Sequence, residues 1–525
     1  MKDVTSMTHA GKLNDGGGNP SGAPARPPQT PDPRWDTIDW PKVYRKVRHL
    51  QQRIAKAMQE GKPGKVRALQ WLLTHAWYAK LLAVKRVTTN TGKRTPGVDG
   101  VLWRTHDKKL QAAHDLRRCG YRAQPLRRIH IPKGNGKTRP LGIPTMRDRA
   151  MQALYLLALA PVAETTADPN SYGFREYRGT ADAIGQGFLC LCQRWSGTWM
   201  LEGDIRACFD HISHEWLVAH VLIDRRVLRQ FLTAGFIWEG ELFPTTAGTP
   251  QGGIISACLA NMVLDGLEQA IHAAAAPSPT NLIRYADDFL VVARESTLLN
   301  DRVIPAITAF LHPRGLALSE EKTVITSVFA GVDFLGQHLR KYGAQGKLLI
   351  TPATKNVRRF LANVKKLIDA SYHLSREELI RRLNAKIRGW ANFHRHICAK
   401  KTFGQVDYRM GDMLIRRERR MNPKIKTREI CRRYFINGPY GGIRKVLPQG
   451  SAYAGERRLL AAHTPIVRHV KVRSSANPYA PEHEAYFAAR RKRRRHQDET
   501  VSQGVERLLA ESSWQNRGRK HMTAL

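Results

Sequence analysis

Apolar and polar positions follow different periods in three parts of the chain. Near the beginning, one apolar set recurs at helical spacing with basic residues between its members, which predicts an amphipathic helix: Val43, Val47, Leu50, Ile54 and Ala57. From residue 120 to 345, short β-rich runs alternate with helical runs, which predicts an α+β sheet domain. Between 355 and 435 the pattern becomes helical and strongly basic.

Two further helices are predicted from apolar spacing. One carries an aromatic stripe that we interpret as core: Trp71, Leu72, His75, Tyr78, Ala79 and Leu82. The other has a single apolar face: Leu379, Leu383, Ile387 and Trp390. Its cationic side chains lie elsewhere on the same helix: Arg381, Arg382, Lys386 and Arg388. Basic helix faces are usually only solvated, so this pattern alone assigns no partner.

Two adjacent acids, Asp287 and Asp288, interrupt an otherwise apolar stretch. Asn-Leu-Ile-Arg-Tyr at 281–285 precedes them and Phe-Leu-Val-Val-Ala at 289–293 follows, which predicts a strand-turn-strand hairpin. Burying an ionised acid without a partner costs several kcal/mol, so a divalent cation is favoured as the counter-charge. For the pair taken alone, the alternative is an ordinary turn whose aspartates face water.

A third acid, Asp204, favours the metal interpretation. It lies near the end of a short apolar strand, ahead of a helix that is predicted to begin at Ser213. An antiparallel sheet can bring together strand ends that are distant in sequence, and a two-metal Mg²⁺ site needs several carboxylate oxygens on rigid elements. We expect Asp204 and Asp287 to bridge two Mg²⁺ ions and Asp288 to complete or support the site. Asp210 is interpreted as a turn or helix-cap residue.

The charge balance indicates a polyanionic partner. Lys and Arg number 86 against 44 Asp and Glu in 525 residues, which gives a formal charge of +42. Nucleic acid fits this charge better than a membrane does. The 7 cysteines include no Cys-x-x-Cys motif, so neither a zinc site nor a disulfide scaffold is expected. No apolar run approaches the roughly 18–20 residues that span a bilayer and no signal peptide is recognisable, so we expect no membrane partner and a cytoplasmic location.

The two ends differ in composition from the middle. Residues 1–33 are rich in Gly and Pro, which predicts a disordered tail. After Pro439 the pattern is irregular. The block Arg-Arg-Lys-Arg-Arg-Arg at 490–495 is expected to stay extended and to contact phosphates.

The acid motifs resemble the palm of a reverse transcriptase. Tyr-Ala-Asp-Asp at 285–288, the upstream Asp204 and an aromatic residue five positions later, Phe209, carry the first part of this resemblance. Further blocks follow in the expected order. Segment 128–144 resembles the fingers motif, 171–175 the segment leading into the palm, and 248–253 the loop that supports template and nucleotide. Segment 318–323 resembles the motif after the catalytic hairpin, and 334–336 the primer grip. An acid pair alone is weak evidence for this family, whereas several motifs in the family's order are specific to it.

The resemblance narrows to the reverse transcriptases and maturases encoded by group II introns. Segments 35–40 and 95–100 resemble that family's N-terminal extension, and segments 383–393 and 432–435 resemble its maturase, or thumb, region. This implies an α+β right-hand polymerase, with an antiparallel sheet in fingers and palm and an α-helical thumb/maturase domain. The implied domains are an N-terminal extension with the start of the fingers (34–120), the fingers and palm (121–345), the thumb/maturase domain (346–440) and a basic DNA- or RNA-binding tail (441–525).

The resemblance also implies roles at the nucleotide. Lys133 and Arg139 would neutralise the triphosphate, with Lys137 as an alternative to Lys133. Phe209 would block a ribose 2′-hydroxyl, although without Asp204 nearby it would be interpreted as a core aromatic. Gln251 would make a polar contact to the nucleotide or template, and Lys322 would approach the leaving pyrophosphate. A plain surface lysine is the alternative for the latter.

Two further sets follow from the same resemblance. The implied primer grip comprises Phe334, Leu335 and Gly336. The implied RNA-binding face comprises Arg381, Arg382, Lys386 and Arg388, because a basic face beside a polymerase palm is suited to grip a duplex or a folded RNA.

The activity implied is RNA-directed DNA synthesis, in which a primer 3′-hydroxyl attacks the α-phosphate of a deoxynucleotide at a Mg²⁺ site. The implied partners are group II intron RNA, an RNA template with a DNA primer, the deoxynucleoside triphosphate and target DNA, with the oligomeric state left open. The basic extension and thumb would bind the intron and favour its active fold. Two alternatives stay open: a reverse transcriptase of a retron, CRISPR-associated or phage-defence system, and a splicing-only RNA-binding maturase.

The end of the chain departs from part of the family. Many relatives end in a metal-binding DNA endonuclease built from paired cysteines and histidines. This chain has no cysteine after Cys431, and its later histidines lack ligand spacing. We therefore expect no endonuclease, and a mobility that primes from existing DNA ends.

Overall fold

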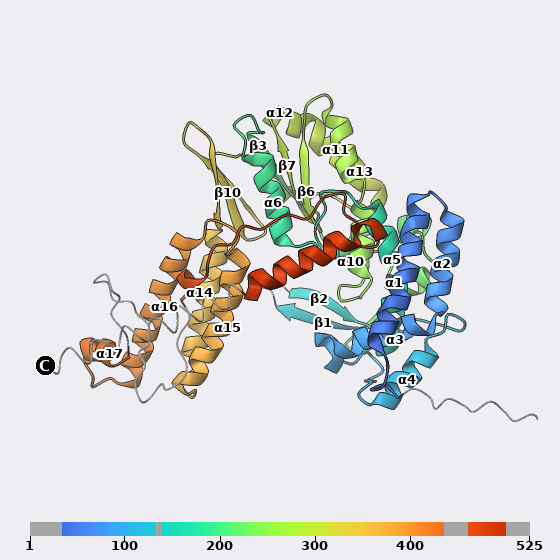
Figure 1. The fold of residues 1–525 in the computed structure, drawn as a ribbon, viewed down its shortest axis with the longest axis horizontal. Coiled ribbons are helices and arrows are strands. Elements are labelled where there is room, and N and C mark those ends of the chain that lie inside the picture. Colours follow the sequence, from blue (N-terminus) through green and yellow to red (C-terminus); the bar gives the residue numbers. More distant parts are fainter. Residues whose placement is uncertain (1–33, 133–135, 137, 435–459, 500–525) are drawn as a thin grey trace, which may run out of the picture.

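The N-terminal helices pack around one buried helix in the computed structural model, which describes residues 34–132, 136, 138–434 and 460–499. Helices α1 (Trp40–Gln59), α2 (Pro63–His75) and α3 (Trp77–Thr89) all contact α5 (Met146–Thr166), as Figure 1 shows. The predicted helix at 43–57 is confirmed as α1. All but one of its apolar set are buried, and Leu50 is partly buried against the core.

The second predicted helix is wrong as a single core helix. Ala76 has an extended backbone (ψ 129°), so α2 ends at His75 and α3 begins at Trp77. Ala79 and Leu82 are buried on α3, but Trp71 and Leu72 of α2 remain 56% and 44% exposed. The break turns the first half of the expected stripe toward solvent.

A four-stranded sheet forms the fingers, in the order β2-β1-β4-β5. Its strands are β1 (Leu126–Pro132), β2 (Thr138–Ile143), β4 (Phe236–Trp238) and β5 (Glu241–Phe243). β1 and β2 form an antiparallel hairpin, and β1 pairs with β4 in parallel. Helices α4, α8 and α9 complete this half of the molecule: His106–Asp115, His214–His220 and Arg225–Leu232.

The second four-stranded sheet is antiparallel throughout and has the order β6-β7-β3-β8. Its strands are β3 (Trp199–Asp204), β6 (Asn281–Tyr285), β7 (Asp288–Ala293) and β8 (Val324–Ser327). Alternate side chains enter two different cores, as the strand period requires. Leu201, Phe289 and Val291 join the larger core with α10, α11 and α13 (Ser256–Leu264, Leu267–Ala275 and Ile304–Leu311). Met200, Leu290 and Val292 join the other core with α6 (Thr180–Leu191).

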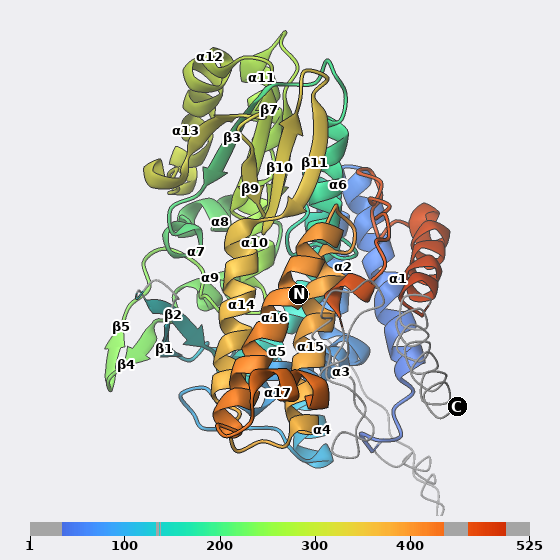
Figure 2. The same ribbon diagram turned by 90° about the vertical axis from the view of Figure 1, so that its left-hand side faces the viewer.

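A three-stranded sheet links this region to the helical thumb. Its order is β11-β10-β9, with β9 (Val332–Phe334), β10 (Gln337–Tyr342) and β11 (Lys347–Pro352). Long helices follow, side by side in Figure 2: α14 (Thr354–Asp369), α15 (Arg376–His394) and α16 (Lys400–Met421), then α17 (Thr427–Tyr434). The predicted apolar face of α15 is confirmed, because Leu379, Leu383 and Ile387 are buried and Trp390 packs against the same core.

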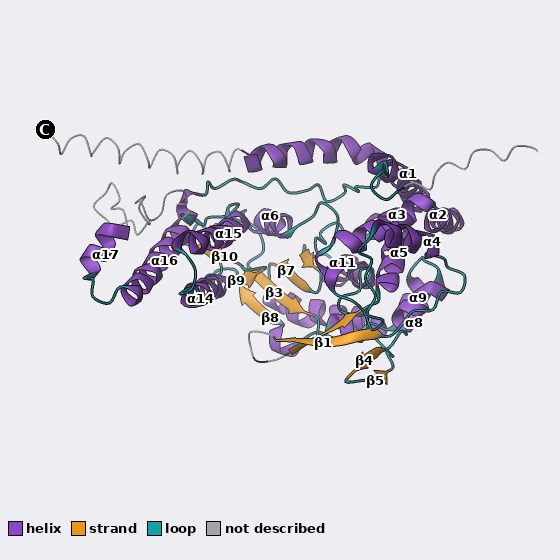
Figure 3. Cartoon of the chain, turned by 90° about the horizontal axis from the view of Figure 1, so that it is seen from below, coloured by secondary structure: helices purple, strands orange, loops and turns teal. Residues whose placement is uncertain are grey.

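Residues 460–499, here called the C-terminal strap, run back from the thumb to α1 (Figures 1 and 3). Lys400 Nζ donates to Thr464 O at 2.9 Å near the thumb, and Gln52 of α1 donates to Glu484 at 3.3 Å at the far end. Residues 484–499 are helical. The expectation that the basic block at 490–495 stays extended is therefore wrong. Arg490 and Arg491 bond to Asp182 and Tyr177, which holds the block on the palm.

The remaining elements are short and lie mainly in connections: α7 (Cys208–His211), α12 (Ser296–Leu298), η1 (Thr91–Arg94), η2 (Leu299–Val303), η3 (His312–Arg314), η4 (Glu320–Lys322), η5 (Ala461–His463) and η6 (Pro481–His483). In the described ranges, no helix has the length and apolarity needed to cross a bilayer. The expected tail at 1–33, Lys133, Lys137, 435–459 and 500–525 lie outside the described residues.

Candidate active site

The antiparallel pairing of β3 with β7 brings the distant acids together. Asp204, the last residue of β3, is the direct cross-strand partner of Asp288, the first residue of β7. Asp287 precedes it in the turn between β6 and β7. The hairpin predicted from the apolar runs is confirmed, because β6 and β7 pair in antiparallel fashion with Ala286 and Asp287 between them.

The hairpin turn is tight and is held from one side by the 171–173 segment. Ala286 has a φ of +59°, a conformation that non-glycine residues rarely adopt. Tyr172 N donates to Arg284 O at 2.9 Å, so the segment runs alongside β6. A Cβ at Gly173 would lie 2.4 Å from Ala286 N, so only glycine allows this approach.

The charges of the three aspartates repel one another. Loss of hydration and the charges of Asp287 and Asp204 raise the pKa of Asp288 to about 7, although its side chain keeps solvent access. Burial also raises the pKa of Asp287, and Lys322 and Arg139 oppose that rise. The site thus attracts positive charge. Lys322 Nζ supplies one, 2.5 Å from Asp204 Oδ2, and this contact raises the lysine's pKa.

The carboxylate oxygens of this site suit a hard divalent cation, but few protein side chains are available as its ligands. In the parts of the chain that the structure describes, no group of three His, Cys, Asp or Glu side chains is arranged to hold a metal by itself. Mg²⁺ at phosphoryl-transfer sites is typically held by one or two carboxylates together with substrate phosphates, rather than by a complete protein cage. Adjacent oxygens from Asp204 and Asp288, with a lysine ammonium beside them, fit that pattern.

A buried charge network lies behind the hairpin, and the sequence pattern hardly indicates it. Arg284 of β6 is fully buried, and its Nη2 lies 2.5 Å from Asp265 Oδ1 and 3.9 Å from Asp168 Oδ2. Its Nη1 donates to Asn261 Oδ1 at 3.3 Å, and Asn261 Nδ2 donates to Gly173 O at 2.7 Å. The network therefore joins β6, α10 and the segment that supports the turn. The only signal was an arginine inside an apolar strand.

The loop at 248–253 joins the palm to the fingers. Thr249 N donates to Phe209 O at 2.7 Å, and Gly142 N of β2 donates to Gln251 O at 2.9 Å. Gln251 Nε2 lies 3.1 Å from both carboxylate oxygens of Asp210. Asp210 is in the short helix α7, and Phe209 beside it is partly buried against the larger core. These hydrogen bonds join the 248–253 loop to α7 on one side and to β2 on the other.

The proposed primer-grip residues form the turn between β9 and β10. Phe334 is buried, and Leu335 and Gly336 both have positive φ, +49° and +79°. A Cβ at Gly336 would lie 2.8 Å from Asn356 Nδ2 of α14, so the turn packs tightly on the thumb. Asn356 Oδ1 in turn accepts from Trp390 Nε1 at 3.0 Å.

The basic residues of α15 are exposed, as expected for a binding face. Arg381 and Arg382 are not free cations, because both form ion pairs with Glu378, that of Arg382 at 2.6 Å. Lys386 and Arg388 complete the exposed set.

Comparison with known proteins decides the family. The "Reverse transcriptase (RNA-dependent DNA polymerase)" model matches residues 131–339, the "N-terminal domain of reverse transcriptase" matches 35–116, and the "Group II intron, maturase-specific domain" matches 357–435. Protein YkfC of Escherichia coli (strain K12) is 31% identical over 348 residues, which are 58% of this chain and 91% of that protein. The chain belongs to the group II intron reverse transcriptases and maturases.

Two other relatives are similar to more than half of this chain. The group II intron-encoded protein LtrA of Lactococcus lactis subsp. cremoris is 26% identical over 427 residues, covering 62% of this chain and 70% of LtrA. Maturase-like protein 1 of Euglena gracilis is 26% identical over 369 residues, covering 68% of this chain and 76% of that protein.

The expected α+β polymerase fold with a helical maturase region is confirmed. This group II intron protein is an RNA-directed DNA polymerase with a maturase domain, and RNA is among its partners. Dependence on a divalent metal accompanies the reverse transcriptase domain.

Proposed function

We propose that Asp204, Asp287 and Asp288 hold Mg²⁺ for nucleotidyl transfer, with the first two bridging the ions and Asp288 completing the site. The observation that carries this proposal is the register of β3 and β7, which sets Asp204 opposite Asp288 beside the strained turn. When bound, Mg²⁺ would neutralise the phosphates and make the primer hydroxyl a better nucleophile. Because the carboxylates are fixed at strand ends, they need little reorganisation to receive the substrate.

The nucleotide is proposed to lie between the acids and the fingers hairpin. Arg139 of β2 is exposed and close enough to Asp287 to lower its pKa, so its guanidinium is in position for the triphosphate. Lys133 is kept in the same role from the family pattern. Phe209 and Gln251 lie where α7 meets the 248–253 loop, and their proposed roles are exclusion of the 2′-hydroxyl and contact with nucleotide or template. Lys322 would leave Asp204 for the pyrophosphate as product forms.

The primer and the intron are proposed to meet the thumb side of the molecule. Phe334, Leu335 and Gly336 would hold the primer, because their turn is fixed between β10 and α14. The exposed basic residues of α15 would contact intron RNA, which stabilises the intron's active fold by mass action. We also propose the domain boundaries 34–120, 121–345, 346–440 and 441–525. The cDNA product is proposed to enter a DNA target, which makes the intron mobile.

We also propose that the protein works in the cytoplasm, with its transcript. Its seven cysteines are all free thiols, as expected in a reducing compartment. The maturase-domain match at 357–435 favours an intron partner over the retron, CRISPR-associated and phage-defence alternatives. The presence of all three aspartates, with Asp204 opposite Asp288 in the palm sheet, favours an active polymerase over a splicing-only maturase.

The test is Asp287→Ala, compared with Asp301→Asn, an exposed aspartate of the palm region outside the site. Loss of a metal ligand removes several kcal/mol of transition-state stabilisation, so we expect primer extension on an RNA template to fall at least about 10³-fold. Intron RNA binding should stay within about twofold of wild type, because the basic surface is intact. Normal extension by Asp287→Ala would refute the site assignment.

A further inference from the structure

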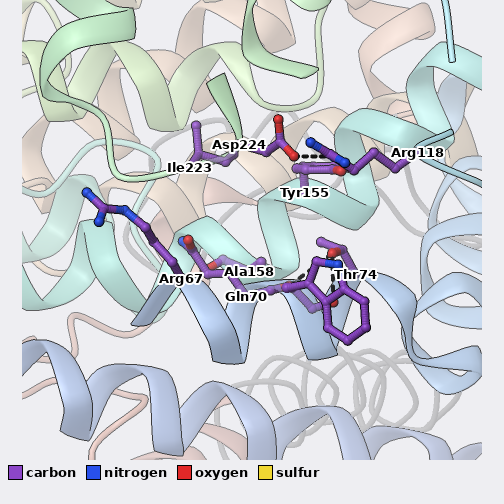
Figure 4. A pocket seen from close by; sticks show the side chains of 9 residues that line it. Arg67, Gln70, Thr74, Arg118, Tyr155, Ala158, Ile223 and Asp224 are labelled. Atoms are coloured by element: carbon purple, nitrogen blue, oxygen red, sulfur yellow. Dashed lines mark hydrogen bonds and ion pairs between the residues drawn. The ribbon is translucent and has the colours of Figure 1, made fainter. Parts of the chain in front are cut away.

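A recess on the outer side of the N-terminal helices contains none of the residues assigned above. It has a volume of about 210 Å³ and is shown in Figure 4. Its lining comes from α2, α5, the connection before α9 and one residue after α4: Arg67, Gln70, Trp71, Thr74, Tyr155, Ala158, Ile223, Asp224 and Arg118.

The floor of the recess is apolar and preformed. Tyr155 and Ala158 of α5 and Ile223 line it. Gln70 is 7% exposed, and its Nε2 donates to Leu222 O at 2.9 Å and to Ala158 O at 3.3 Å. These bonds tie α2 to α5 and to the connection, so the walls exist without a ligand.

Trp71 offers an exposed aromatic wall that is already held in one orientation. Its side chain is 56% exposed and stacks on His75, with ring centroids 4.3 Å apart and an angle of 25°. His75 Nδ1 lies 2.8 Å from Trp71 O, which fixes the imidazole beneath the indole. An aromatic ring held this way loses little freedom when another ring stacks on it.

Positive charge borders the same wall. Arg67 lies at the recess, is exposed and has no ion-pair partner among the described residues. Arg118 is bonded to Asp224 across the recess, so the one acid of the lining is already paired. An exposed aromatic wall with a cation beside it is suited to an aromatic base that stacks on the ring and carries a phosphate to the cation.

We propose that this recess binds an unpaired nucleotide of the intron RNA, whose base stacks on Trp71 and whose phosphate meets Arg67. The proposal rests on the proposed intron-RNA partner. The charge of +42 favours RNA over a protein segment as the occupant. A second copy of this chain would bring the same positive charge and is disfavoured for that reason.

The experiment compares Trp71→Ala with Trp195→Ala, a tryptophan that is 72% exposed and lies outside the recess. The probe is the intron RNA transcribed from the sequence flanking the coding region. We expect Trp71→Ala to weaken its binding about five- to tenfold, Trp71→Phe to restore most of the affinity, and Trp195→Ala to leave it unchanged. With 4-thiouridine in the RNA, the crosslinked peptide should contain Trp71.

Primer extension on poly(rA) with oligo(dT) separates this proposal from the proposed function. We expect Trp71→Ala to extend that substrate at the wild-type rate, which shows a folded polymerase. The proposal is overturned by unchanged intron affinity in Trp71→Ala, by equal losses in both tryptophan variants, by equally good competition from fully paired RNA, or by a change in oligomeric state in Trp71→Ala.

Discussion

Arg284 and Asp265 form an ion pair of 2.5 Å in the protein interior, behind the β6–β7 hairpin. Arg284 is fully buried, and burial raises the pKa of Asp265 to about 7 against the opposing effect of the arginine. Such a pair is costly to desolvate and costs even more to break. Its position between β6 and α10 suggests that it fixes the hairpin that carries Asp287 and Asp288.

Replacing Arg284 by Met should therefore affect stability first. The change leaves Asp265 buried without its partner, and we expect a loss of about 3–5 kcal/mol in the free energy of unfolding. The measurement is the urea midpoint of the full chain. The double variant Arg284→Met/Asp265→Asn should recover most of the loss, because it removes the Asp265 charge together with its nearest partner. A single variant as stable as wild type would show that the pair does not support the hairpin.

The thumb helix α15 should contribute to the salt dependence of RNA binding. Neutralising Arg381, Arg382 and Arg388 to Gln removes up to three phosphate contacts, so the slope of log K against log salt should fall by up to about 2. The measurement is a salt titration of intron RNA binding. Glu378→Gln is the matched control.

That control should shift binding in the opposite direction. Glu378 pairs with both Arg381 and Arg382, and these contacts lower its pKa, so it is an anion on the proposed RNA face. Its removal leaves both arginines available to phosphate, and affinity should rise at low salt. An unchanged slope in the triple variant would exclude α15 as an RNA contact.

The C-terminal strap should depend on one buried acceptor of α6. Asp182 Oδ1 accepts from Val472 N at 2.7 Å, Arg490 Nη2 at 2.8 Å and His469 Nε2 at 2.9 Å. Burial opposes its ionisation, but these bonds and charges outweigh burial and lower the pKa of Asp182. We expect Asp182→Ala to make local opening of the strap easier by about 3 kcal/mol, because several buried donors lose their acceptor.

Hydrogen exchange in 464–499 measures that opening. The backbone amides of the strap should exchange about 100-fold faster in Asp182→Ala, and trypsin should cut the helical block at 490–495 sooner. Asp498→Ala is the control, since its pair with Arg395 is 54% exposed on the aspartate side and should matter little. Equal exchange in Asp182→Ala and wild type would contradict an anchoring role.

Local pattern predicted the elements whose stability is mostly local. The apolar set of α1 follows the helical period, and the runs at 281–285 and 289–293 leave only three residues between them, which predicts a hairpin. Asp204 could be predicted to lie beside this hairpin, because it is an acid at the end of an apolar strand and the carboxylate pair needs a cation with further acidic ligands.

The features that the sequence missed depend on contacts between distant segments. The partners of Arg284 lie on other elements, so no spacing along β6 indicates them. The basic block at 490–495 repels itself in isolation, yet it is helical because Arg490 and Arg491 meet Asp182 and Tyr177 of the palm. The spacing of Trp71 fits a buried apolar stripe on one continuous helix. The helix in fact ends before Ala76, and alanine at that position does not predict such a break.

A buried histidine makes the thumb sensitive to acid. His394 of α15 is fully buried, and burial, together with the charge of His396, lowers its pKa to about 4 from an ordinary value of 6.5. Between these values the unfolded chain binds a proton that the folded thumb does not, so stability is complete above pH 6.5 and is lost as pH falls toward 4. The loss amounts to about 3 kcal/mol for this residue.

His394→Gln tests this prediction, because glutamine does not titrate and can still donate to Asn356 Oδ1, which lies 3.2 Å from His394 Nε2. Hydrogen exchange of α14 and α15 at pH 7.5 and 4.5, corrected for intrinsic rates, should show strong acid weakening in wild type and much less in the variant. His373→Gln, at an exposed site between the same helices, should behave as wild type. Equal acid weakening in His394→Gln and wild type would assign the effect to other groups of the thumb.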